Sequence, residues 1–77
     1  MSVEERVKGI LLDILDIDEG TVVPEATLIT DLGASSVDLV EIIAAIENQF
    51  DIEISDEEAQ KIRTVRALID YLKKKTS

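Results

Sequence analysis

The 77-residue sequence predicts one all-α domain over residues 1–77, a small bundle of three longer helices and one short helix. Apolar residues recur at helical spacing in the longer segments, and no stretch shows a convincing strand alternation. Hydrophobic residues make up 45% of the chain and aromatic residues only 3%, so the core must be built from Ile, Leu and Val.

The first helix is predicted from Val3 to about Leu15. Ser2 and Glu5 have the spacing of a capping box, in which a serine and an acid satisfy free amides at a helix start. An acidic turn that ends at Gly20 closes the helix. Its apolar stripe consists of Val3, Val7, Ile10, Leu11 and Ile14.

A long connection through Pro24 to Ala34 separates the first two helices. Its apolar side chains predict a loop that packs onto the core, and packed loops of this length are often functional. These side chains are Val22, Val23, Leu28, Ile29 and Leu32.

The second helix is predicted from Ser36 to Phe50, and its two faces differ. The core face carries Leu39, Ile42, Ile43, Ile46 and Phe50. The opposite face mixes acidic with apolar side chains: Val37, Val40, Glu41, Ala44 and Glu47.

The last two helices are predicted from Asp56 to Lys61 and from Val65 to Lys74. Ser55 with Glu58 forms a second possible capping box, and Thr64 is the expected cap of the final helix. Three consecutive lysines at residues 73–75 suit a helix C-terminus by charge–dipole attraction. The inward side chains of the final helix are Val65, Leu68, Ile69 and Leu72.

The net charge of −9 is unevenly distributed, because none of the eight basic residues lies between Gly9 and Gln60. Such a surface either keeps the protein in solution or steers basic partners, and composition alone leaves both open. It argues against nucleic acid and anionic membrane as partners. No signal peptide and no apolar run of transmembrane length is present, which predicts a cytoplasmic protein without membrane insertion.

Composition also limits the chemistry available to the chain. Without cysteine it has no disulfide, thiolate nucleophile or Cys-bound zinc, and without histidine it lacks the commonest general base. The acidic stretches 16–19 and 51–58 do not have the ligand pattern of an EF-hand. We therefore expect no required metal and no catalytic residues.

The serine corner, residues 33–36, is the most informative stretch. Gly33 allows a tight turn, Ser35 suits the N-cap, and Ser36 then takes the first helical position with a free side chain. Amide donors and the helix dipole there favour a negative group such as a phosphodiester on Ser36. Three roles remain: a nucleophile that lacks a base, a pair of capping serines, or an acceptor modified by a separate enzyme.

The motif Asp31–Val37, which reads Asp-Leu-Gly-Ala-Ser-Ser-Val, resembles the attachment motif of the acyl carrier protein family. In that family the motif is followed by an acidic helix, as it is here. Further resemblances occur in the family's order and spacing at Glu4–Val7, Phe50–Ala59, Lys61–Val65 and Ile69–Leu72. The resemblance covers essentially the whole chain and implies the family's helical bundle.

The resemblance implies that a phosphopantetheinyl transferase moves 4′-phosphopantetheine from coenzyme A onto Ser36. The thiol of that arm carries acyl cargo as thioesters, which acyl-processing enzymes of fatty-acid or related biosynthesis receive. The protein would be a monomer and not an enzyme, and the thiol that carries the cargo would come from coenzyme A because the chain has no cysteine. The alternatives are a carrier of polyketide, aminoacyl or other unusual acyl groups, and an unmodified helical interaction module.

The same resemblance makes the second helix the recognition helix, which meets Arg and Lys patches of partner enzymes. The predicted recognition residues are Val37, Asp38, Val40, Glu41, Ala44 and Glu47. The family has an aspartate before the modified serine, whereas this chain has Ser35, and Asn48 and Gln49 are neutral where relatives are often acidic. These differences predict a specialised carrier with a restricted set of partners, and attachment at Ser35 is the alternative site.

Overall fold

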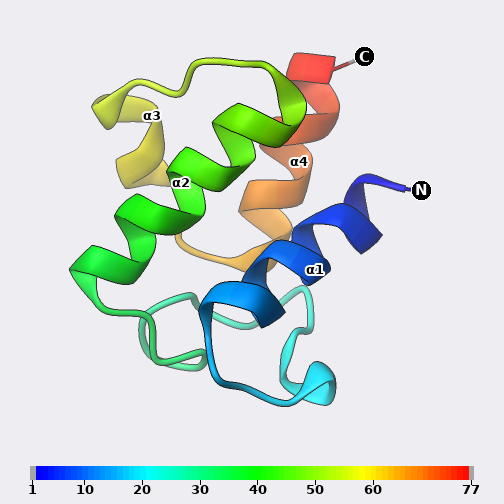
Figure 1. Ribbon diagram of the computed structural model, residues 1–77, viewed down its shortest axis with the longest axis vertical. Coiled ribbons are helices and arrows are strands. Elements are labelled where there is room, and N and C mark those ends of the chain that lie inside the picture. Colours follow the sequence, from blue (N-terminus) through cyan, green and yellow to red (C-terminus); the bar gives the residue numbers. More distant parts are fainter. Residues whose placement is uncertain (1, 77) are drawn as a thin grey trace.

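The computed structural model describes residues 2–76, so the two ends of the predicted domain, Met1 and Ser77, lie outside it. Within this range the chain forms four α-helices and a short 3-10 turn, with no strand (Figure 1). The predicted all-α class is confirmed. The elements are α1 (Val3–Ile14), the 3-10 turn (Glu19–Thr21), α2 (Ser36–Phe50), α3 (Asp56–Lys61) and α4 (Val65–Thr76).

The start of α1 follows the predicted capping residues. The Ser2 hydroxyl oxygen accepts the Glu5 amide at 3.1 Å and donates to the Glu5 carboxylate at 3.2 Å. The helix ends at Ile14, one residue before the predicted boundary. Leu15 leaves the helix in an extended conformation, with φ −101° and ψ 140°, and is only 5% exposed. The apolar stripe therefore continues past the helix end because Leu15 still packs inward.

The core lies where α1 packs against α2 and α4. It is aliphatic, as predicted, while Phe50 and Tyr71 are only partly buried around it. Arg6 joins α1 to the end of α2: its guanidinium donates to the Gln49 carbonyl at 2.7 Å and lies 4.0 Å from the centre of the Phe50 ring. The largest fully buried side chains are Val7, Leu11, Ile42, Ile46, Leu68 and Leu72.

The long connection between α1 and α2 crosses the end of the bundle at which α2 begins (Figure 1). Leu28 and Leu32 are buried, as predicted, but Val23 and Ile29 are 43% and 61% exposed, so inward packing was wrongly expected for those two. Leu28 and Leu32 are spaced by one turn and point inward together. The intervening residues, Ile29 among them, face outward.

Backbone bonds tie this connection to the chain between α3 and α4. The Leu28 amide donates to the Arg63 carbonyl at 2.9 Å, and Thr27 and Thr64 form an isolated antiparallel bridge. Thr64 also caps α4 as predicted, since its hydroxyl accepts the Ala67 amide at 3.0 Å. The start of α4 is thereby held against the loop that precedes the serine corner.

Candidate functional site

A side-chain clasp shapes the loop before the serine corner. The Asp31 carboxylate accepts the Thr27 amide at 2.8 Å and the Thr27 hydroxyl at 3.2 Å, while the Asp31 amide donates to that hydroxyl at 3.1 Å. The three bonds close a tight turn over residues 27–31. The motif aspartate is thus a structural residue of the loop, a role our sequence analysis missed although the four-residue spacing of Thr and Asp was a signal.

Gly33 provides the reversal that brings the chain into α2. Its φ of +73° lies in the left-handed region, which residues with a side chain rarely adopt. On either side, Leu32 and Ala34 are buried, and the Ala34 amide donates to the Leu28 carbonyl at 2.9 Å. The burial of Leu32 and Ala34 therefore fixes the corner on the core, and the two serines that follow are exposed to solvent.

Ser35 is the N-cap of α2, as predicted. Its hydroxyl accepts the Asp38 amide at 3.1 Å, and the Asp38 carboxylate accepts the Ser35 amide at 2.9 Å, which completes a capping box. Both polar groups of Ser35 are engaged in starting the helix. This arrangement assigns the capping role to Ser35 and leaves the neighbouring serine out of it.

Ser36 is the first residue of α2 and is exposed. Within residues 2–76, no hydrogen bond engages its hydroxyl. Ser36 thus lies in the first turn of α2, where the free amides and the helix dipole favour negative charge. No base holds the hydroxyl, which suits an acceptor modified by another enzyme better than an independent nucleophile.

The side of α2 beyond the corner carries an unusual amount of exposed apolar surface. Val37 is 68% exposed and Val40 is 70% exposed, and both Glu41 and Ala44 are exposed beside them. We call these four residues the docking surface. The other two predicted recognition residues, Asp38 and Glu47, are partly buried and accept hydrogen bonds from the chain's own backbone.

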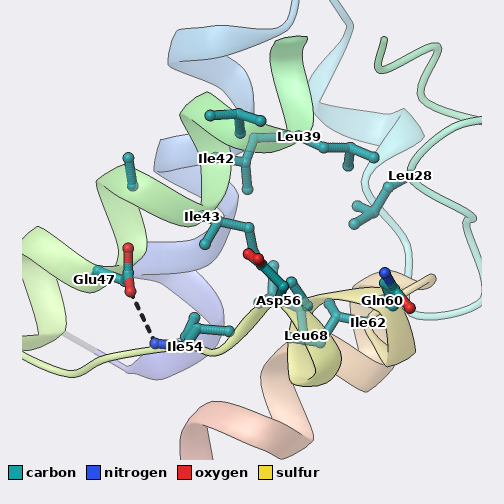
Figure 2. Close-up of a pocket in the computed structure, with 13 residues that line it drawn as sticks. Leu28, Leu39, Ile42, Ile43, Glu47, Ile54, Asp56, Gln60, Ile62 and Leu68 are labelled. Carbon is teal, nitrogen blue, oxygen red and sulfur yellow. Dashed lines mark hydrogen bonds between the residues drawn. The ribbon is translucent and has the colours of Figure 1, made fainter. Parts of the chain in front are cut away.

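The main cavity, about 510 Å³ in volume, lies between α2 and α3 (Figure 2). Its α2 wall includes Leu39 and Ile43, which are partly buried, and Leu28 and Ile62 contribute further apolar surface. The periodicity of α2 identified Leu39 and Ile43 as inward-facing. It did not reveal that α3 leaves space opposite them.

Polar side chains lie around this apolar space. Figure 2 shows Asp56 and Gln60 extending from α3 and Glu47 extending from α2. The Glu47 carboxylate accepts the Ile54 amide at 2.8 Å, at the chain segment that leads into α3. An apolar interior with polar groups at its edge suits an aliphatic chain that enters from water.

A side cavity of about 450 Å³ adjoins the main cavity on the side of the long connection. It shares Leu28, Leu39 and Ala59 with the main cavity and extends to Ile29 and Thr30. Leu39 lies three residues after Ser36, hence on the same side of α2. The two cavities therefore share part of their lining, including Leu39, the fourth residue of α2.

Short-range interactions hold α3 in place at its first turn. Ser55 caps the helix by accepting the Glu58 amide at 3.1 Å, and the Glu58 carboxylate accepts the Ser55 amide at 3.3 Å, as the predicted capping box requires. The Ser55 amide keeps the pKa of Glu58 below its ordinary value of 4.5. On α4, burial raises the pKa of Tyr71 to about 12, and the nearby Glu58 carboxylate adds to this effect.

Within residues 2–76, no helix has the length and apolarity needed to cross a membrane, and no group of three or more acidic side chains is placed to hold a metal ion. A comparison with protein families finds that the family model described as "Phosphopantetheine attachment site" matches residues 5–72. The match begins in α1, ends in α4 and contains the serine corner. It therefore covers the helices, both cavities and the docking surface together.

Proposed function

The chain belongs to the phosphopantetheine-attachment family and is a carrier of covalently bound 4′-phosphopantetheine, and on this premise we propose that Ser36 is the attachment residue. The observation that carries the proposal is the division of roles at the corner. Ser35 is engaged in the capping box, whereas the exposed Ser36 hydroxyl has no hydrogen bond within the described chain.

The residues around Ser36 fit a phosphodiester at this position. The first-turn amides and the dipole of α2 stabilise a negative group, and Gly33 adds no side chain to the corner. When bound, the arm supplies a thiol that holds an acyl group as a thioester. The base that takes the Ser36 proton belongs to the modifying transferase, and we propose that the carrier itself catalyses no reaction.

We propose that the cargo is an aliphatic acyl chain of fatty-acid or related biosynthesis, sheltered in the main cavity. Leu39, Ile43 and Ala59 offer it apolar walls, and Leu39 lies three residues after Ser36 on α2. Each methylene group that leaves water there contributes about 0.8 kcal/mol. The chain gains this shelter without any polar contact of its own, which suits a cargo that changes during synthesis.

We further propose that partner enzymes bind the docking surface. Val37, Val40 and Ala44 offer an apolar contact beside Ser36, and Glu41 offers a carboxylate to a basic side chain. Asp38 and Glu47 already accept internal bonds, so they add to the acidic field more than to direct pairing. An exposed ion pair contributes about 0.2–1 kcal/mol, which suits docking that must be brief.

The replacement of the family's aspartate by Ser35 supports a specialised carrier with few partners. Ser35 keeps the capping function but has no carboxylate beside the attachment residue. A transferase that relies on that carboxylate would modify this chain slowly. A monomeric, cytoplasmic protein of a single domain stays our prediction from the sequence.

The attachment proposal is tested by incubating the unmodified protein with a promiscuous phosphopantetheinyl transferase, magnesium and coenzyme A, followed by intact mass measurement. We expect the wild-type protein to gain the mass of one arm, Ser36→Ala to gain none, and Ser35→Ala to be modified still. No gain in the wild type, under conditions that modify a control carrier, would exclude the carrier function. Modification of Ser36→Ala but not of Ser35→Ala would move the site to Ser35.

A further inference from the structure

Glu47 differs from the other acidic residues of α2 in what its carboxylate does. Figure 2 shows its side chain at the wall of the main cavity, directed toward the segment between α2 and α3. There its Oε2 accepts the Ile54 amide at 2.8 Å, across seven residues of sequence. Glu41 lies nearly two turns earlier, is exposed, and forms no side-chain bond within residues 2–76.

The Ile54 amide marks the point at which the chain turns from α2 into α3. Ile54 is 8% exposed and lines the main cavity, and the next residue, Ser55, is the cap of α3. The Glu47–Ile54 hydrogen bond therefore links α2 to the residue that precedes the cap of α3.

The short helix α3 depends on such bonds at its ends because its own six residues include none that is buried. At the far end, Ile62 is 7% exposed, and the Arg63 carbonyl accepts the Leu28 amide. At the near end, the Glu47–Ile54 hydrogen bond connects the segment before α3 to α2. Loss of that bond would free the beginning of α3 to move away from the cavity.

We propose that Glu47 is a positioning residue for cargo shelter, since its bond to Ile54 holds α3 over the main cavity and limits the access of water to a bound thioester. The proposal rests on the carrier function, because a chain without cargo has nothing to shelter. It separates Glu47 from Glu41: Glu41 acts on partners, and Glu47 acts on the cavity.

The first test measures hydrogen exchange at the Ile54 amide by NMR in the unmodified proteins. In Glu47→Ala the amide loses its acceptor, so we expect it to exchange about tenfold faster. Glu47→Gln keeps an oxygen in the same place and should stay close to the wild type. Glu41→Ala is the matched control and should leave the rate unchanged. An unchanged rate in Glu47→Ala would overturn the proposed tie.

The second test measures thioester protection. The wild-type protein and its variants are loaded with octanoyl-phosphopantetheine from octanoyl-coenzyme A, and cleavage by hydroxylamine is followed by intact mass. We expect several-fold faster cleavage in Glu47→Ala alone, and rescue in Glu47→Gln. Equal protection in Glu47→Ala and the wild type would overturn the proposal, even where exchange at Ile54 is faster.

Ser2→Ala controls for a general loss of stability. It removes the cap of α1, which lies outside both cavities, and should lower the unfolding temperature without changing cleavage. Faster cleavage in Ser2→Ala, equal to that in Glu47→Ala at a matched loss of stability, would assign protection to global stability and overturn the role of Glu47. If the wild type takes up no arm, the carrier function fails and cargo shelter with it, whereas the exchange result still reports whether Glu47 holds α3.

Discussion

The two sides of α2 differ in how completely they are covered. On the side that faces the core, Ile46 is fully buried and lines neither cavity. Toward α3, Leu39 and Ile43 are only partly buried; both border the main cavity, and Leu39 also borders the side cavity. The same kinds of side chain on one helix thus build a closed core on one side and an open apolar space on the other.

The difference arises from the helices that cover each side. The twelve residues of α1 bring three buried side chains, Val7, Ile10 and Leu11, to α2, whereas the six residues of α3 bring none. The closed side therefore provides most of the stability. The contacts of the open side contribute less to holding the fold together, which agrees with our proposal that it accepts the acyl chain.

The largest expected effect contrasts isoleucines on the two sides. Ile46→Ala should lower the free energy of unfolding by about 2–5 kcal/mol, because it leaves a cavity in close packing. Ile43→Ala should cost about half as much, since Ile43 already borders open space. Urea unfolding measures both. Equal losses would show that the two sides are packed alike and would contradict the comparison.

The next effect comes from adding volume instead of removing it. Ala26 is 4% exposed in the closed core, and Ala26→Leu should cost about 1–3 kcal/mol through overpacking. Ala59 lines both cavities, so the matched change Ala59→Leu should leave stability nearly unchanged. The added side chain should instead occupy cargo space and speed thioester cleavage. A large loss of stability in Ala59→Leu would indicate that the space beneath α3 is closed.

The paired serines extend the contrast to the corner where α2 begins. Ser35→Ala removes the hydroxyl of the capping box and should lower the free energy of unfolding by about 1 kcal/mol. Ser36→Ala removes a hydroxyl that has no hydrogen bond in the described chain. It should change the free energy of unfolding by less than about 0.5 kcal/mol. Thermal unfolding of the two variants, compared at one pH, tests this division. A larger loss in Ser36→Ala would reverse it.

The sequence predicted the helices well because their ends are local features. Ser2, Ser35, Ser55 and Thr64 each accept an amide proton where a cap was expected, and α2 and α3 have their predicted bounds. The end of α4 was predicted less well, since this helix continues to Thr76, two residues beyond its expected end. Helix ends are the least certain part of a prediction from sequence, and no local signal such as a glycine marks this one.

The open side of α2 could not be predicted, because periodicity identifies an inward face but not the element that covers it. The exposure of Ile29 follows from the Thr27–Asp31 clasp, and the internal bond of Glu47 follows from the path of the chain before α3. Both depend on contacts that a single sequence does not specify. The recognition role predicted for Glu47 therefore rested on the family resemblance and on its position in the second helix, without knowledge of this internal bond.

A further effect, confined to alkaline pH, is a pH dependence of stability on the α4 side of α3. Burial raises the pKa of Tyr71 from 10.0 to about 12, so folding favours the neutral phenol. This contribution to stability is complete below pH 10.0 and is lost as the pH rises toward about 12. Tyr71→Phe should lose less stability over that range than the wild type. Parallel pH profiles of the two proteins would contradict this account.

The most direct test of the central claim is the NMR spectrum of the protein loaded with an octanoyl chain, compared with the protein that bears only the arm. We predict that the chain changes the methyl shifts of Leu39, Ile43 and Ala59 beside the cavities, while those of Val7 and Leu11 on the closed side stay in place. Changes confined to the closed side, or no changes on either side, would contradict the assignment of cargo to the space between α2 and α3.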